Sequence, residues 1–172
     1  GEPSGFPFGL HRLCPRPCRE RIKKKSIEMP MSMTTIVLAD SDPVDRDTLG
    51  DQFQRAGFAV AQAHSPAQIP NLIALHHPAL VLIDPHGHER EVLSLIDGVV
   101  AADPHLPVLM LSAAPTVDGI LEALRHGVWD YLSKPVTDPA TVLARVGRAL
   151  ERSRVARAAS RMPQDHEQQM HR

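Results

Sequence analysis

Four residues with chemically useful side chains follow short aliphatic runs along the chain. Asp40 follows TTIVLA, Asp84 follows ALVLI, Ser112 closes VLMLS, and Lys134 follows YLS. Two carboxylates that meet repel each other unless a cation lies between them, and hard oxygen ligands favour Mg²⁺. The lysine adds positive charge, and the hydroxyl can bind an oxygen of an anion. The set predicts a carboxylate that attacks phosphorus while a metal ion and Lys134 neutralise the developing charge.

The segments around these residues alternate between short aliphatic runs and longer amphipathic stretches. Runs such as IVLA and VLML are typical of strands buried on both faces. We therefore predict an α/β fold, a doubly wound five-stranded parallel sheet with helices on both faces. Ligands of such sheets bind at the carboxyl ends of the strands, where all four residues lie. The predicted strands are 34–40, 58–63, 78–84, 106–113 and 128–135, and the predicted helices are 43–57, 65–77, 88–104, 115–127 and 137–159.

Local signals add detail to two of these elements. Ser65 is placed to cap the helix over 65–77, and Pro70 must lie in its first turns or shorten it. Trp129 and Tyr131 lie two residues apart near the last strand. Side chains alternate along a strand, and the two are predicted to face opposite ways.

Composition indicates one domain of ordinary size with an aliphatic core, since the 172 residues are 42% hydrophobic but only 3% aromatic. No apolar run approaches the roughly 18 residues of a membrane span, and the N-terminus lacks the pattern of a secretory signal. These features predict a soluble, cytoplasmic chain without membrane contact. The formal charge is +4 over residues 1–33, −7 over 34–150 and +2 over 151–172.

The two flanking segments lack the apolar periodicity of a folded domain. Residues 1–33 are rich in Gly, Pro and basic residues, and are interpreted as a disordered leader, a cloning-derived segment or the product of an upstream misread start. A metal site at Cys14 and Cys18 lacks a second ligand pair. Residues 151–172 are expected to extend the last helix into a linker or tail.

The motifs IVLADSDP, LVLID, VLMLSA and YLSKP, in that order over residues 34–150, resemble the receiver domain of two-component response regulators. The resemblance implies a flavodoxin-like fold and phosphoryl transfer to Asp84 from a histidine kinase, a phosphotransfer protein or a small phosphodonor. Ser112 would bind the phosphoryl group and shift toward it, Lys134 would pair with it, and Tyr131 would turn inward as the switch aromatic. It implies a signalling domain that switches a partner or effector, not a turnover enzyme.

The resemblance also implies Mg²⁺ as a cofactor, held by Asp40, Asp84 and the backbone carbonyl of His86. Receivers usually place two adjacent acids after the first strand, whereas this chain has Ser41 at the second position. Asp42 could substitute if the loop turns it inward. Receivers also usually carry Met-Pro shortly after the phosphorylated aspartate, where this chain reads DPHGHE. These departures leave an alternative, a degenerate receiver that acts as a phosphorylation-independent interaction module.

Two further alternatives are less favoured. His86 and His88 with Asp84 could bind zinc, but exposed loop histidines are the more common case. A flavodoxin-like cofactor binder would need a phosphate-binding loop after the first strand, and the sequence has none.

The output of the domain is expected to lie in an effector after residue 172 or in a separate protein. The sequence itself carries no helix-turn-helix pattern, so direct nucleic-acid binding is not expected. A homodimer through the fourth and fifth helices is plausible, and phosphorylation is expected to strengthen it. The basic residues available for such an interface are Arg145, Arg148, Arg152 and Arg154.

Overall fold

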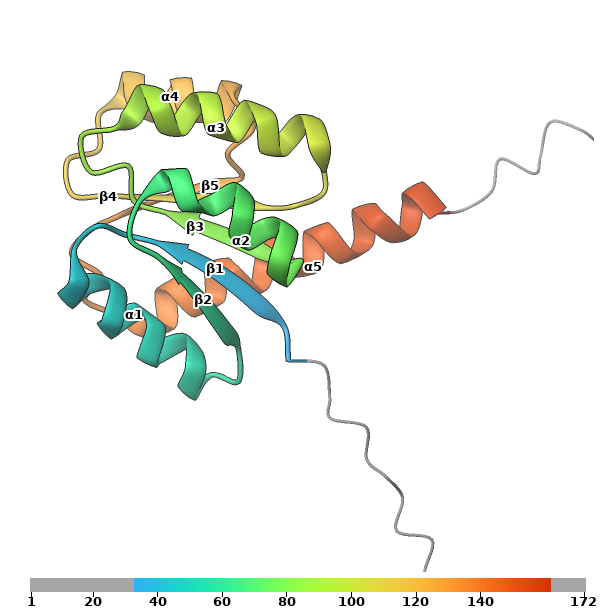
Figure 1. The fold of residues 1–172 in the computed structure, drawn as a ribbon, viewed down its shortest axis with the longest axis horizontal. Coiled ribbons are helices and arrows are strands. Elements are labelled where there is room, and N and C mark those ends of the chain that lie inside the picture. Colours follow the sequence, from blue (N-terminus) through green and yellow to red (C-terminus); the bar gives the residue numbers. More distant parts are fainter. Residues whose placement is uncertain (1–32, 162–172) are drawn as a thin grey trace, which may run out of the picture. The chain divides into compact units, whose positions relative to one another are not determined.

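Five parallel strands form one sheet in the order β2-β1-β3-β4-β5. The computed structural model describes residues 33–161. The predicted doubly wound parallel sheet is confirmed, and the strand order reverses between β1 and β3 (Figure 1). The strands are β1 Thr35–Ala39, β2 Ala59–Ala63, β3 Leu80–Ile83, β4 Val108–Ser112 and β5 Asp130–Ser133.

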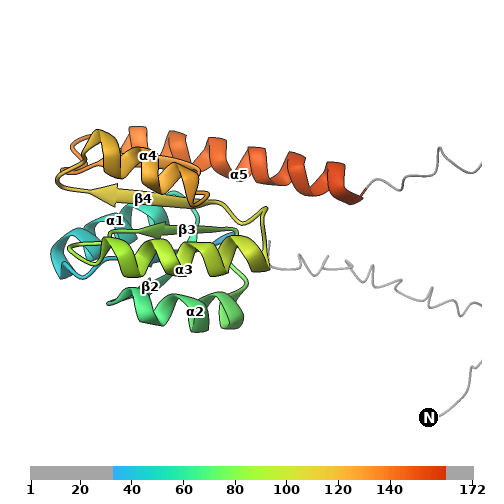
Figure 2. The same cartoon turned by 90° about the horizontal axis from the view of Figure 1, so that it is seen from above.

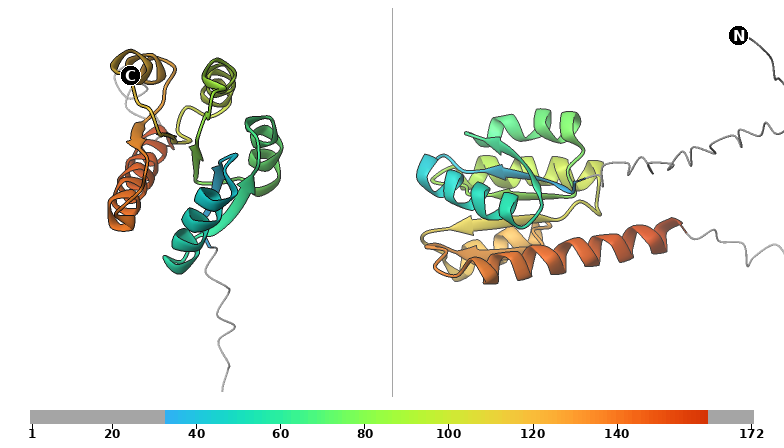
Figure 3. Two further views of the ribbon diagram at one scale, coloured as in Figure 1. Left: turned by 90° about the vertical axis from the view of Figure 1, so that its left-hand side faces the viewer. Right: turned by 90° about the horizontal axis from the view of Figure 1, so that it is seen from below.

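Helices cover both faces of this sheet, with α2, α3 and α4 on one face and α1 and α5 on the other (Figure 3). Alternate residues of each strand feed two aliphatic clusters. Val37 and Ile83 pack on the α2, α3, α4 face, and Ile36 and Leu82 pack on the α1, α5 face. The helices are α1 Pro43–Arg55, α2 Ile69–His76, α3 Glu89–Ala102, α4 Val117–Arg125 and α5 Pro139–Arg161.

The segment predicted as one helix over 65–77 is divided in two. A 3₁₀ turn, Pro66–Gln68, precedes α2, which begins at Ile69 with Pro70 in its first turn. Proline has no amide hydrogen to donate to a preceding carbonyl, which accounts for the start of α2 at this point. The prediction that Ser65 caps the helix is wrong, because its side chain accepts no capping hydrogen bond.

Trp129 and Tyr131 pack against opposite faces of the sheet, as predicted, but not through strand alternation, which would put residues two apart on one face: Trp129 precedes β5. Trp129 contacts the cluster under α1 and α5, whereas Tyr131 contacts the cluster under α2, α3 and α4. Three of the four arginines proposed for a dimer interface have partners within the chain. Arg145 pairs with Asp130 at 2.8 Å, the guanidinium of Arg152 lies 4.6 Å from the Trp129 ring centroid, and Arg154 pairs with Glu151 at 2.7 Å.

The far end of α5 is fixed to the edge of the sheet at which the strands begin. Arg157 Nη2 lies 2.6 Å from Asp103 Oδ2, and the buried Ser153 hydroxyl donates to the His105 carbonyl at 2.5 Å. His105 Nε2 and Ser160 Oγ are 2.9 Å apart. In Figure 2, α5 is seen to run on past the ends of α3 and β4. Within residues 33–161, no helix has the length and apolarity that a bilayer crossing requires.

Candidate functional site

Three of the predicted site residues meet at the carboxyl ends of the strands. Asp40 directly follows β1, Asp84 follows β3 and Lys134 follows β5. The Lys134 ammonium lies 2.6 Å from Asp40 Oδ2 and also bonds Asp84 Oδ2. All three side chains are almost fully buried, with exposed fractions of 0% for Asp40, 4% for Asp84 and 7% for Lys134. One ammonium therefore bridges two buried carboxylates.

The register of the sheet explains why these residues converge. Ala39 pairs with Ile83, so the aspartates that follow them leave neighbouring strands at the same level. The Asp84 amide continues this ladder by donating to the Ala39 carbonyl at 2.8 Å. The Lys134 amide donates to the Ser112 carbonyl at 2.8 Å, and the long lysine side chain spans the end of β4 to reach both aspartates.

Burial and pairing act in opposite directions on the protonation of this cluster. Burial raises the pKa of Asp40 above its usual value, although the hydrogen bond from Lys134 opposes the shift. Burial disfavours the charged form of Lys134, but its hydrogen bonds to the carboxylates of Asp40, Asp84 and Asp45 raise the pKa of the ammonium well above its usual range. Lys134 is consequently a permanent positive charge in the site.

Asp42 does not join the cluster. Its carboxylate caps α1 by accepting from the amides of Val44 at 2.8 Å and Asp45 at 3.3 Å, and these bonds lower the pKa of Asp42. Its own amide donates to Asp40 Oδ1 at 2.9 Å. The loop turns the Asp42 side chain toward the helix, and the neutral Ser41 is exposed. The structure thus offers neither residue as a second acid beside Asp40.

The sequence analysis missed two members of the site, Asp45 and Arg46 in the first turns of α1. Asp45 Oδ2 lies 2.9 Å from the Lys134 ammonium. Arg46 is buried, and its Nη1 donates to the Asp40 carbonyl at 2.9 Å. The sequence held a local signal for the position of Asp45, because an acid is favoured in the first turn of a helix, and Pro43 is typical of a helix start.

The remaining predicted residues lie around the cluster, and of these the His86 backbone bonds to it. Ser112 Oγ accepts from the Ala114 amide at 3.2 Å at the half-buried end of β4. Tyr131 is half-buried in β5. His86 adopts a left-handed backbone with φ of 37°, and its amide donates to Asp84 Oδ1 at 2.9 Å. The two oxygens of Asp84 therefore have different partners, an amide and an ammonium.

The zinc alternative has no support within residues 33–161, where His86 and His88 belong to no group of three His, Cys, Asp or Glu side chains that could hold a metal ion. His88 Nδ1 instead lies 3.5 Å from Glu91 of α3. Cys14 and Cys18 lie outside the described residues.

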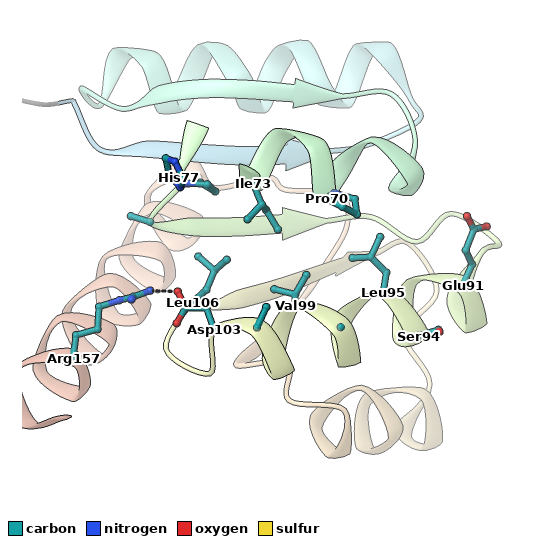
Figure 4. Close-up of a pocket in the computed structure, with 14 residues that line it drawn as sticks. Pro70, Ile73, His77, Glu91, Ser94, Leu95, Val99, Asp103, Leu106 and Arg157 are labelled. Atoms are coloured by element: carbon teal, nitrogen blue, oxygen red, sulfur yellow. Dashed lines mark hydrogen bonds and ion pairs between the residues drawn. The ribbon is translucent and has the colours of Figure 1, made fainter. Parts of the chain in front are cut away.

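A separate groove lies on the face of the sheet that α2 and α3 cover. This groove of about 1000 Å³ runs between α2 and α3, with Ile73, Leu95 and Val99 on its walls and the Asp103–Arg157 pair at one end (Figure 4). It shares no residue with the carboxylate cluster. The groove is therefore not the candidate site.

Comparison with known proteins agrees with this geometry. Residues 36–146 match the family model of the response regulator receiver domain. The chain belongs to this family. Over 120 residues the receiver is 33% identical to the DNA-binding transcriptional regulator NtrC of Rhizobium meliloti, covering 70% of this chain and 25% of that protein. The chain thus spans about a quarter of the length of this relative.

Solved structures share the receiver fold. NtrX from Brucella abortus, crystallised with ADP, is 26% identical with a TM-score of 0.67, covering 74% of this chain and 28% of that one. A response regulator from Burkholderia pseudomallei, crystallised with a phosphorylated aspartic acid, a calcium ion and citrate, is 23% identical with a TM-score of 0.60, covering 75% of each chain. The second likeness concerns the fold alone.

Proposed function

We propose that this receiver accepts a phosphoryl group on Asp84. The observation that carries the proposal is the buried Lys134 ammonium, which bonds Asp84 and Asp40 together. An ammonium beside the attacking carboxylate can neutralise charge on the transferred phosphoryl oxygens. In the transfer, an Asp84 oxygen forms a bond to phosphorus. The bond from phosphorus to the donor breaks, and its electron pair leaves with the donor.

The donor set fits a hard divalent cation such as Mg²⁺. Asp40 and Asp84 are buried carboxylates that share one cation, Lys134, so their oxygens already converge on a positive charge. Both carboxylates and the His86 carbonyl would hold the metal, and Lys134 would then give up part of its contact with them. When bound, the metal supplies positive charge that offsets the charge of the phosphoryl oxygens. Receiver domains bind Mg²⁺ in general, and the Burkholderia pseudomallei relative contains calcium.

Ser112 and Tyr131 are the proposed switch residues. The added charge on Asp84 would draw the Ser112 hydroxyl, whose hydrogen-bond partner within residues 33–161 is the Ala114 amide. The movement would open space on the α4 side of β5, into which the half-buried Tyr131 would turn. The altered α4, β5 and α5 surface is the proposed output.

The proposed partners are a histidine kinase or phosphotransfer protein as donor, and an effector, separate or in the same protein. The match to about a quarter of an NtrC-type regulator supports an effector domain in such a protein. A cytoplasmic location and a dimer strengthened by phosphorylation belong to the same proposal. Light scattering with and without beryllofluoride tests the dimer, for which Arg148 is the exposed arginine without an intramolecular partner among the described residues.

Phosphorylation with acetyl phosphate and Mg²⁺, followed by intact mass, tests the function. We expect the full chain to gain one phosphoryl group and to lose this gain in EDTA or as Asp84→Asn. Asp103→Asn is the matched control, since it neutralises a paired aspartate at the opposite edge of the sheet.

Absence of any gain, under conditions that modify an ordinary receiver, would overturn the proposal. The chain would then be a degenerate receiver, with the neutral Ser41 and the helix-capping Asp42 as the reasons.

A further inference from the structure

Lys134 has a third carboxylate partner that the proposed phosphorylation does not use. Asp45 Oδ2 lies 2.9 Å from the ammonium, and the Asp45 side chain is 50% exposed, in contrast to the buried Asp40 and Asp84. It approaches from α1, whereas the other two approach from strand ends. Asp45 therefore lies at the solvent side of the cluster.

The N-terminus of α1 alone does not account for this position. Asp42 already caps the helix, and the Asp45 amide donates to it. A carboxylate in the first turn would complement the helix dipole from any exposed direction. The Asp45 side chain instead contacts Lys134, which comes from β5 nearly ninety residues further along the chain.

The contact between Asp45 and Lys134 matters because negative charge is in excess around this lysine. Three carboxylates share one ammonium, so the cluster has more negative than positive charge. Arg46 is a nearby buried cation, but its guanidinium donates to the Asp40 backbone carbonyl and not to a carboxylate of the cluster. A phosphoryl group on Asp84 would add further negative charge and would need Lys134 as its partner.

We propose that Asp45 competes with the phosphoryl group for Lys134 and so weakens the phosphorylated state of Asp84. Asp45 is a positioning residue in this scheme, because it acts through Lys134. In the resting chain it helps to hold the ammonium. In the phosphorylated chain it is a negative charge beside the phosphoryl oxygens. The inference rests on the proposed function and adds to it a residue that limits the strength of the signal.

Beryllofluoride binding to the full chain, followed by ¹⁹F NMR at saturating Mg²⁺, tests the competition. Beryllofluoride is a non-covalent analogue of the phosphoryl group, so its affinity reports the stability of the loaded state without transfer kinetics. We expect Asp45→Asn to bind it about fivefold more tightly, since removing a neighbouring like charge favours an anion. Asp45→Glu, which keeps the charge, should stay within about twofold of the wild type. Asp51→Asn should do the same, because it makes the same charge change at an exposed site on α1.

The sign of the change decides the outcome. Unaltered affinity in Asp45→Asn would overturn the competition. Weaker binding would also overturn it, and would make Asp45 a residue that supports the metal or orients Lys134. If the wild type gains a phosphoryl group but Asp45→Asn binds beryllofluoride no more tightly than the wild type does, this inference alone is refuted. A wild type that neither gains the group nor binds beryllofluoride would refute the proposed function and the inference together.

Discussion

The two edges of the sheet each carry an ion cluster, and the clusters are built differently. At the carboxyl edge three carboxylates share Lys134, and two of them are buried. At the opposite edge one carboxylate, Asp103, faces one guanidinium, Arg157, with both side chains more than a third exposed. The second pair is balanced and serves to attach α5. Excess buried charge of one sign is unfavourable for stability, and such sites are where function is found.

Removal of the shared cation should produce the largest difference between the edges. Lys134→Met would leave two buried carboxylates without their ammonium, and we expect a loss of about 3–5 kcal/mol in the free energy of unfolding. Arg157→Met should cost about 1 kcal/mol or less, because the pair is solvent-exposed. Urea unfolding at neutral pH in EDTA measures both. Equal losses in the free energy of unfolding would show that the cluster at the carboxyl edge depends on its cation no more than the Asp103–Arg157 pair does.

The pH dependence of stability should have opposite signs at the two edges. Burial raises the pKa of Asp40 above 3.8, so the folded chain holds this proton more tightly than the unfolded chain. The contribution of Asp40 to stability is therefore fully present below pH 3.8, the pKa in the unfolded chain, and is lost as pH rises through the pKa in the folded chain. Burial acts to raise the pKa of Asp103, but the hydrogen bonds from Arg157 and the His105 amide, together with the nearby positive charge, outweigh it and the net shift is downward. The contribution of Asp103 to stability is therefore present above pH 3.8 and is lost as pH falls through the pKa of Asp103 in the folded chain.

Unfolding of Asp40→Asn and Asp103→Asn across acidic to neutral pH measures these contributions. The wild-type advantage over Asp40→Asn should shrink as pH rises, and the advantage over Asp103→Asn should grow. Parallel curves for the two variants would remove the electrostatic distinction between the edges.

The hydroxyl that attaches α5 should have a smaller effect. Ser153 is buried and donates to the His105 carbonyl, so Ser153→Ala would leave that carbonyl without this donor and should cost about 1 kcal/mol. Ser94→Ala is the matched control, because the same substitution removes an exposed hydroxyl on α3, away from α5. Hydrogen exchange should accelerate in the last turns of α5 for Ser153→Ala. Equal exchange in both variants would mean that Ser153 does not hold the helix.

The smallest effect is expected where Arg152 covers Trp129. Arg152→Gln removes a cation 4.6 Å from the ring centroid at an exposed position and should cost about 0.5 kcal/mol. Trp129 is the one tryptophan of the sequence, so its fluorescence reports this contact directly. Arg148→Gln, on the same helix and exposed, should leave the emission unchanged.

The sequence predicts the carboxyl-edge cluster because sheet geometry does most of the positioning. Aliphatic runs mark the strands, parallel strands end at one edge, and Asp40, Asp84 and Lys134 follow three such ends. Asp45 and Arg46 escaped prediction since their contacts depend on how the first turn of α1 faces β5. The same holds for Asp103, Arg157 and Ser153, whose bonds depend on where a long helix crosses the far edge. Pairings between elements distant in sequence leave no periodic signal.

The family match ends at residue 146, but α5 continues as one helix of 23 residues to Arg161. At 1.5 Å per residue this helix is about 35 Å long, and each residue is rotated by about 100° around the helix axis relative to the one before it. Ser153 and Arg157 fix the helix to the sheet edge beyond the matched region. The domain therefore sets how far Arg161 lies from the sheet and in which direction around the helix axis it points. Insertion of one residue after Arg157 would change the distance little, but it would point the end of the helix in a different direction.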